Sequence, residues 1–290
     1  RLDIPNPVSL SWTGSATSIS IYEGTSTSGT VVKNVSFSSS SSVEIYNLIP
    51  GKTYSYRTSN GQTGTFNTTG RRRMIKVSDN ADQWHARNCR DFGGIKTAKG
   101  QTLKYGLMYR GTNMDQITSD PDGKNILLNE LGILMDVDLR GKSGSGPLGS
   151  GVAVSGIGYT SGDLDNSRND SNIAQTLTDI LDYVIDGKPV YIHCQIGSDR
   201  TGYICMLLQA LLGASKKECD IDYEITSFAS GIVGGTRTKE YVDNKDFRVK
   251  FSSNADQTPQ AVENYVVNTL KISMDKVKSF RRAMGVDETL

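Results

Sequence analysis

The sequence holds little that would indicate a membrane, metal or disulfide protein. Its 290 residues include seven prolines, two histidines and only four cysteines. No apolar run reaches the roughly 18 residues that a membrane-spanning helix needs. Neither CxxC nor HExxH spacing occurs, so we predict no metal site and no cofactor. The cysteines suggest no disulfide framework. They are Cys89, Cys194, Cys205 and Cys219.

Charge is also balanced, which narrows the possible partners. The 32 basic and 31 acidic side chains leave a net charge of +1. Because there is no overall basic field, we expect neither nucleic acid nor an anionic membrane as the principal partner. At 290 residues the chain exceeds the usual size of one domain, so two domains are expected. It begins at Arg1 rather than methionine, which suggests a leader that was removed or omitted.

Composition changes sharply near residue 70. Residues 1–70 hold seven charged side chains and are rich in Ser and Thr. Short alternating runs, with turn signals about every eight to twelve residues, predict an all-β sandwich. The stretch Leu48–Tyr56 resembles the late-strand signature of fibronectin type III modules, with Pro50 and Gly51 making the turn. The serine run 38–42 is predicted to be a hairpin loop.

Residues 71–290 show an alternating α/β pattern instead. Residues 132–138 and 189–193 read as buried strands, and apolar side chains recur at helical spacing between 173 and 185. Strands followed by helices predict a mainly parallel sheet flanked by helices. Further helices are expected to begin at Ser215, Thr258 and Ser273.

One segment, His193–Gly202, carries the chemistry. It separates Cys194 and Arg200 by five residues, between an apolar β-branched run and a helix-forming run. A strand, a tight loop and a helix turn several backbone N–H groups and the positive helix end into one concavity. Such a cup suits a tetrahedral oxyanion. Cys194 can attack phosphorus there, and Arg200 can hold two phosphoryl oxygens.

The residue types fit a cysteinyl-phosphate mechanism. Aligned N–H dipoles and Arg200 should lower the pKa of Cys194 from the usual value of about 8.5. Thr201 can hydrogen-bond the sulfur and make it a better leaving group. Gly197 permits a backbone conformation that a Cβ disfavours, and His193 is expected to orient the loop rather than act as a base. The predicted phosphate-binding residues are Gln195, Ile196, Gly197, Ser198, Asp199 and Arg200.

This segment resembles the P-loop of cysteine-dependent protein-tyrosine phosphatases, HC-x5-R-[ST]-G. It is most similar to a bacterial branch of tyrosine and phosphoinositide phosphatases whose loop reads HCxxGKDRTG. Residues 88–94, 106–111 and 138–140 are similar to the branch motifs NxRDxGG, GxxYRS/G and DLR and follow the same order. The resemblance covers roughly residues 85–285. Ser198 stands where the branch usually has lysine, which weakens any inference that several phosphates bind together.

Two placements of the general acid are open. Departure of a tyrosine or inositol oxygen needs a proton, usually from a carboxyl group. Asp199 lies inside the loop, and the resemblance implies that it is the acid. Asp163 and Asp165 lie about thirty residues before Cys194, where many members of the superfamily place a mobile acid loop. An adjacent Arg200 should lower the pKa of Asp199, so burial or the bound phosphate would have to keep it protonated.

Several residues are supporting candidates. By resemblance, the segment around Arg90 and Asp91 approaches the loop, and Asp91 is a candidate to orient Arg200 or another loop group. Arg110 is a further candidate, and an ion-pair network and direct substrate contact are both open for these three. Cys89 is a candidate for a reversible disulfide that protects Cys194 from overoxidation.

We therefore predict a phosphomonoester hydrolase, most simply a protein-tyrosine phosphatase acting on a phosphorylated protein. The alternative enzyme is an inositol-phosphate or phosphoinositide phosphatase with the same loop. The alternative of another class is a non-catalytic phosphate-binding or adhesion protein. Because fibronectin-like modules accompany exported proteins, we expect a secreted or cell-envelope location, periplasmic or lipid-anchored, in a bacterium.

Overall fold

The computed structural model describes residues 3–142, 144–158, 169–229 and 251–290. The chain divides into two compact units. One is Pro5–Arg73, and the other is Met74–Leu290 together with Arg1–Ile4. The larger unit thus differs from the expected 71–290 by taking in the start of the chain. Within the described ranges, no helix has the length and hydropathy that crossing a bilayer requires.

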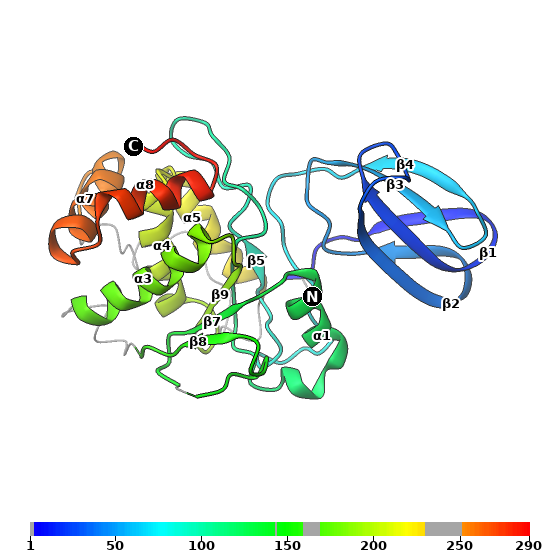
Figure 1. The fold of residues 1–290 in the computed structure, drawn as a ribbon, viewed down its shortest axis with the longest axis horizontal. Coiled ribbons are helices and arrows are strands. Elements are labelled where there is room, and N and C mark those ends of the chain that lie inside the picture. Colours follow the sequence, from blue (N-terminus) through cyan, green and yellow to red (C-terminus); the bar gives the residue numbers. More distant parts are fainter. Residues whose placement is uncertain (1–2, 143, 159–168, 230–250) are drawn as a thin grey trace. The chain divides into compact units, whose positions relative to one another are not determined.

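The smaller unit is an antiparallel sheet (Figure 1). Its described residues form one sheet in the order β2-β1-β3-β4, over a small core around Ile19, Ile21 and Tyr54. The all-β character agrees with the prediction, while the second layer of a sandwich stays a prediction. The strands are β1 (Val8–Glu23), β2 (Val31–Ile45), β3 (Thr53–Thr58) and β4 (Thr63–Asn67).

The serine run 38–42 is not a hairpin loop. It lies within β2 and pairs with β1, through Ser42 opposite Ser11 and Ser40 opposite Ala16. The register shifts between these pairs, and small side chains tolerate such irregular pairing. Serine is a weak strand former, and the neighbouring strand decides its conformation here.

The larger unit is built on a five-stranded sheet in the order β5-β6-β9-β7-β8. Strands β6, β9, β7 and β8 are parallel, and only β5 runs antiparallel to its neighbour. The predicted mainly parallel sheet is therefore confirmed. The strands are β5 (Arg90–Asp91), β6 (Met108–Gly111), β7 (Met135–Asp138), β8 (Ala153–Ser155) and β9 (Val190–His193).

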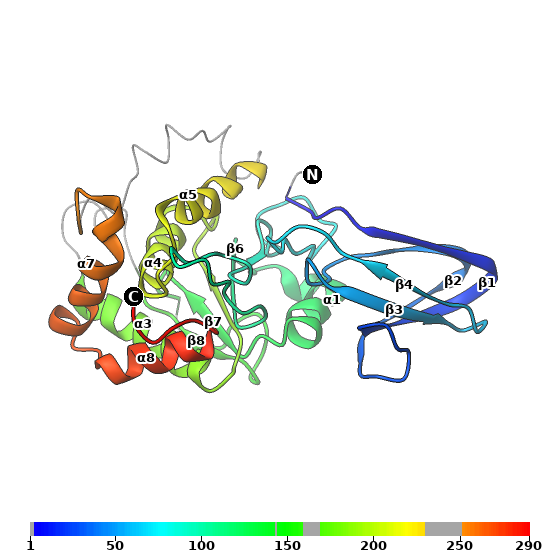
Figure 2. The same ribbon diagram turned by 90° about the horizontal axis from the view of Figure 1, so that it is seen from above.

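Helices cover both faces of this sheet. The larger group packs on one face and the short α1 lies on the other, as the two views show (Figures 1 and 2). The predicted starts agree, since Ser215 and Ser273 cap α5 and α8 and a proline occupies the first turn of α7. The helices are α1 (Pro121–Asn125), α3 (Asp170–Ile185), α4 (Asp199–Leu211), α5 (Lys216–Glu224), α7 (Thr258–Asn264) and α8 (Met274–Ala283).

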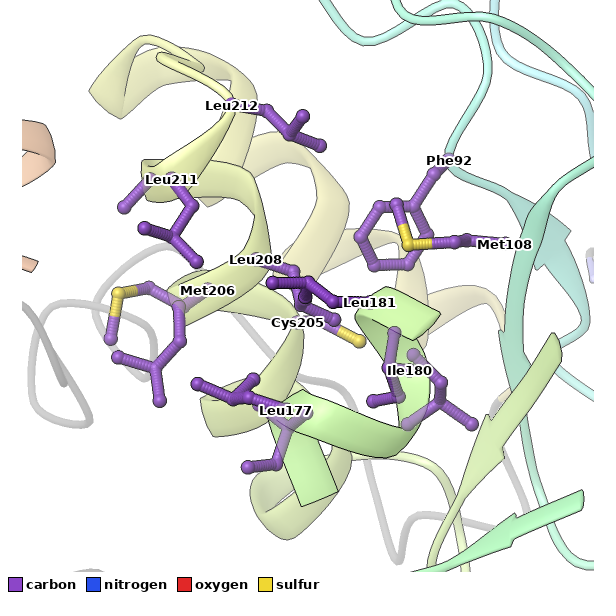
Figure 3. Close-up of a cluster of buried hydrophobic side chains, with 14 of the residues drawn as sticks. Phe92, Met108, Leu177, Ile180, Leu181, Cys205, Met206, Leu208, Leu211 and Leu212 are labelled. Atoms are coloured by element: carbon purple, nitrogen blue, oxygen red, sulfur yellow. The ribbon is translucent and has the colours of Figure 1, made fainter. Parts of the chain in front are cut away.

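Strand alternation builds two hydrophobic cores. In β9, Val190 and Ile192 enter the cluster under α3 and α4, whereas Tyr191 enters the cluster on the opposite face. Figure 3 shows the first cluster, where Leu181 of α3 and Leu208 of α4 pack together with Phe92 and Met108. Helix α4 is buried on all sides, so its N-terminal end is held firmly against the sheet.

A buried ion pair attaches the start of the chain to the larger unit. Asp3 accepts hydrogen bonds from Arg87 Nη2 at 2.8 Å and Nε at 3.0 Å, and both side chains are buried. Asp3→Ala should lower the free energy of unfolding by about 3–5 kcal/mol, because Arg87 keeps its buried charge without a partner. Urea unfolding measures this. Asp186→Ala removes an exposed pair with Lys188 and should cost much less, because solvent screens that pair. Equal losses in both variants would contradict the assignment.

Candidate active site

Cys194 lies where the central strand ends. Strand β9 runs between β6 and β7, and the residues after His193 turn directly into α4 at Asp199. This is the carboxyl edge of the parallel strands, where open α/β sheets place their ligands. Cys194 is 2 % exposed and lies just before the N-terminal end of α4, which is buried from Thr201 to Leu211. Strand, loop and helix therefore have the predicted order.

The sulfur of Cys194 is surrounded by donors. The backbone N–H groups of Gly197 and Thr201 and the hydroxyl of Thr201 lie close enough to it to stabilise its anion. That hydroxyl is buried and has no hydrogen-bond partner within the described part of the chain, so it is available to the thiolate. Burial raises the pKa of Cys194, but these donors and the charge of Arg200 outweigh it, and the pKa is lowered overall.

Alkylation should single out this thiol. We expect iodoacetamide to modify Cys194 with a pH midpoint below the ordinary thiol value of about 8.5, because its thiolate is stabilised. Cys205 should stay unmodified in the folded protein, since burial raises its pKa to about 12. Peptide mapping against pH measures both. A midpoint for Cys194 at or above 8.5 would contradict the donor arrangement.

Side chains outside the loop hold its carbonyl groups. Asn113 donates from Nδ2 to the Gln195 carbonyl at 2.8 Å, and Arg110 donates from Nη2 to the Gly197 carbonyl at 2.9 Å. In a planar trans peptide, the carbonyl and the next N–H point in opposite directions. The N–H groups of Ile196 and Ser198 are therefore turned away from these outer side chains, towards the concave side of the loop.

A buried ion network lies beneath the loop. Arg110 Nη1 donates to Asp222 Oδ2 at 2.6 Å, and Arg90 Nε donates to Asp222 Oδ1 at 2.9 Å. Gln209 Nε2 also donates to Asp222, at 2.8 Å. Burial, followed by the like charge of Arg110, lowers the pKa of Arg90 to about 10. Of the two roles left open for Arg90, these contacts correspond to the ion-pair network.

The described contacts of Asp91 are with the backbone of two turns. Its carboxylate accepts hydrogen bonds from the N–H of Gly93 at 2.8 Å and of Gly106 at 3.0 Å. These contacts tie together the turns before β6. The described contacts give Asp91 a role in turn geometry, and its orientation of Arg200 or another loop group stays a prediction.

Both ring nitrogens of His193 lie against hydrogen-bond acceptors. Its Nε2 lies 2.8 Å from Asp136 Oδ1, and its Nδ1 lies 2.9 Å from the Cys194 carbonyl oxygen. Both partners are acceptors. Burial lowers the pKa of His193, but the Asp136 carboxylate outweighs it and raises the pKa overall. A protonated ring satisfies both contacts, which agrees with an orienting role for His193.

Gly197 is required by a close approach. Its φ is +67°, and a Cβ placed there would overlap the Gly111 carbonyl and come within 3.0 Å of the Thr112 nitrogen. The loop therefore packs directly on the backbone that follows β6. Any other residue would have to push the loop away from it.

Asp199 is the candidate acid that the structure describes. It opens α4, is half-buried and accepts a hydrogen bond from the Tyr223 hydroxyl on Oδ1 at 2.6 Å. The contact fixes the carboxyl group at the start of α4. Asp163 and Asp165 lie outside the described residues.

The rim beside the loop carries paired charges. Arg140 binds Asp138 and Asp115 and reaches the side-chain oxygen of Gln195 at 3.4 Å. Burial raises the pKa of Asp115, yet Arg140 and Lys142 lower it to about 2. Next to this rim lies a cavity of about 400 Å³, lined by Asp115, Asp136, Asp138 and Lys142 and by the turn around Gly146.

The four cysteines are reduced, buried thiols. Cys194 belongs to the cluster under α3 and α4, whereas Cys89 packs with Tyr191 in the cluster on the other face of the sheet. Pairing of Cys89 with Cys194 stays a hypothesis, and the structure holds the two thiols reduced. Among the described residues, no group of His, Cys, Asp or Glu has the geometry to hold a metal ion.

Sequence reasoning missed the residues that support the loop from other elements. A partial signal existed for Asp136, because a carboxylate in an apolar strand needs a buried partner. Asp222 shares a helix face with the buried Glu218 and Cys219, which also suggests a buried carboxylate. Neither pattern indicates which residue pairs with the carboxylate. The missed residues are Asn113, Asp115, Asp136, Gln209, Asp222 and Tyr223.

Comparison with known families agrees with this geometry. A sequence profile described as "Tyrosine phosphatase family" matches residues 83–161 and 163–285, which is more than half of the chain. The chain belongs to the tyrosine phosphatase family and is a cysteine-dependent phosphatase. No curated protein matches the chain by sequence.

Solved structures offer two distant likenesses. The core catalytic domain of the PP-IP phosphatase SIW14 from S. cerevisiae, in complex with citrate, is 16 % identical, with a TM-score of 0.36. That match covers 64 % of this chain and 95 % of the other. A second structure of the Siw14 catalytic core is 14 % identical, with a TM-score of 0.36, and covers 67 % and 97 %.

Proposed function

We propose that the protein is a protein-tyrosine phosphatase that works through a cysteinyl-phosphate intermediate. The observation that carries this proposal is the Cys194 sulfur, buried among N–H donors with a lowered pKa. A thiolate needs no base to become a nucleophile. The half-buried Arg200 lies close enough to the sulfur to stabilise its charge.

The residues divide the reaction into two displacements. The Cys194 thiolate forms a bond to phosphorus as the bond to the leaving oxygen breaks, and Asp199 gives that oxygen its proton. Arg200 and the N–H groups of the loop stabilise the equatorial oxygens. Water then attacks phosphorus, the deprotonated Asp199 accepts its proton, and the sulfur departs as a thiolate that Thr201 stabilises.

The charges at the rim favour a substrate that carries a single phosphoryl group. Among the described residues, Arg140 and Lys142 are already paired with Asp115 and Asp138. The charged side chains that line the cavity next to this rim are three carboxylates and Lys142. A polyphosphorylated inositol would bring further anions against them, whereas a phosphotyrosine side chain would not.

We further propose that Pro5–Arg73 is a fibronectin-like module of an exported bacterial enzyme. The Tyr54 hydroxyl lies 3.1 Å from the Ile49 nitrogen and 3.3 Å from its carbonyl oxygen. A tyrosine that hydrogen-bonds the backbone a few residues upstream is typical of immunoglobulin-like sandwiches. The distribution of the protein between cell and culture medium tests the location.

A substrate panel tests the activity. Phosphate release is measured from phosphotyrosine peptides, phosphoserine peptides, phosphoinositides and soluble inositol phosphates at equal concentration. We expect the highest kcat/KM with phosphotyrosine peptides. Hydrolysis confined to inositol phosphates or phosphoinositides would replace the tyrosine assignment by that alternative. No hydrolysis of any of them would contradict the proposed substrate classes.

Asp199→Asn tests the general acid. The amide keeps the shape of the side chain but cannot give a proton, so kcat should fall about 10²-fold or more. The loss should be largest for phenyl phosphates with poor leaving groups and smallest for p-nitrophenyl phosphate. Asp220→Asn is the control, because the Asp220 carboxylate pairs with Lys216 within α5 and not with Asp199. Equal losses across leaving groups would exclude Asp199 and turn attention to Asp163 and Asp165.

A further inference from the structure

The buried network beneath the loop centres on one carboxylate that lies in none of the four motifs. Asp222 belongs to α5 and is 2 % exposed. It joins Arg90 of β5 and Arg110 of β6, two buried cations whose like charges repel each other. A single buried carboxylate between two guanidinium groups sets where both of them lie.

We propose that Asp222 is a positioning residue for phosphate binding. It holds the Arg110 fork so that Nη2 binds the Gly197 carbonyl, and this directs the next N–H, of Ser198, at the phosphoryl group. The inference rests on the cysteinyl-phosphate chemistry proposed above. It adds a residue on a distant helix to the machinery that shapes the loop.

The geometry of arginine makes this coupling rigid. Nη1 of Arg110 lies 2.6 Å from Asp222 Oδ2, and Nη2 of the same guanidinium lies 2.9 Å from the Gly197 oxygen. The group is planar, so fixing one nitrogen fixes the other. Because the peptide after Gly197 is planar as well, its N–H has one direction only.

Asp222 is itself prevented from rotating. Arg90 Nε holds Oδ1 at 2.9 Å, and Gln209 Nε2 holds Oδ2 at 2.8 Å. Arg90 also donates to the Asp222 backbone carbonyl at 2.7 Å, which fixes α5 against the network. The carboxylate is therefore a fixed anchor rather than one of several counter-ions for Arg110.

The next residue acts on the other side of the same loop. Tyr223 donates to Asp199, at the end of the loop where α4 begins. Two consecutive side chains of α5 thus hold the Gly197 carbonyl, through Arg110, and the candidate acid. A displacement of α5 would disturb phosphate binding and proton transfer together.

Inhibition by inorganic phosphate tests the proposal with p-nitrophenyl phosphate as substrate. Asp222→Asn places an amide where two guanidinium groups need acceptors, so Arg110 loses its anchor. We expect the phosphate inhibition constant to rise about tenfold to a hundredfold, as for the loss of one charge-assisted hydrogen bond. The pH midpoint of Cys194 alkylation should not rise, because the donors to the sulfur remain. Asp220→Asn should leave both quantities unchanged.

Two further variants keep the result decisive. Arg110→Lys retains the charge but cannot bridge both partners, and adding it to Asp222→Asn should weaken phosphate binding no further. Gln209→Met removes one hydrogen bond to Asp222 without removing a charge, and it should raise the inhibition constant about threefold. This variant provides the test if Asp222→Asn does not fold. Unchanged phosphate inhibition in folded variants, or additive effects, would overturn the proposal. The proposed substrate class can fail separately, since neither hydrolysis of p-nitrophenyl phosphate nor inhibition by inorganic phosphate depends on it.

Discussion

Cys194→Ser should abolish turnover, with a loss of at least about 10⁴-fold in kcat. A serine hydroxyl stays protonated where the thiol ionises, so the nucleophile disappears although the side chain keeps its size. The N–H groups of the loop and Arg200 are untouched, and binding of phosphate should stay within a few-fold of the wild type. Steady-state kinetics and phosphate inhibition measure the two effects separately.

The control for this variant is Cys219→Ala, which removes a buried thiol of α5 far from the loop in sequence. It should keep kcat. Turnover that survives in Cys194→Ser would remove the nucleophile assignment, and parallel losses of turnover and phosphate binding would indicate a collapsed loop instead.

The wild-type kcat/KM should rise with pH along an acid limb that ends below about 8.5, because the lowered pKa of Cys194 makes the thiolate available there.

Gly197→Ala should lower kcat/KM and phosphate affinity by at least about 10²-fold and cost about 2–4 kcal/mol of unfolding free energy. The added Cβ would meet the backbone of Gly111 and Thr112, which has no freedom to rotate away. The loop must move, and the Gly197 carbonyl leaves Arg110. Peptide N–H groups that bind the phosphoryl oxygens move with it.

Gly187→Ala separates the cost of a side chain at positive φ from the cost of the close approach to backbone atoms. Gly187 also has a positive φ, +73°, but nothing lies within 4 Å of the added Cβ. It should cost only the left-handed penalty of about 1–2 kcal/mol and leave activity unchanged. Chemical unfolding with an activity assay on the same samples makes the comparison. A Gly197→Ala variant no worse than Gly187→Ala would show that the close approach is not needed.

The main strands and helices were predictable because they depend on residues that lie close together in the sequence. The apolar run before Cys194, the glycine within the loop and the helix former after it lie in one stretch, and the structure keeps their sequence as strand, loop and helix. The helix starts at Ser215 and Ser273 were also readable, since an N-cap binds a backbone N–H three residues away.

What sequence reasoning missed depends on contacts between distant segments. The serine run 38–42 reads as a loop, yet pairing with β1 draws it into β2. Arg90 and Asp91 are adjacent in the sequence, yet their described contacts belong to different parts of the fold, the ion network and a turn. Adjacent residues in a strand face opposite ways, so adjacency says little about shared function.

The sequence by itself determined the chemistry of this protein: a thiol, a guanidinium and a helix start within ten residues define the phosphate cup. Only the tertiary structure decided how that cup is held. Asn113, Asp136 and Asp222 come from three elements whose approach no spacing encodes, and they fix the loop through Arg110, His193 and the backbone. Local bonding follows from the order of residues, whereas buried polar groups find their partners only when the sheet and helices have packed.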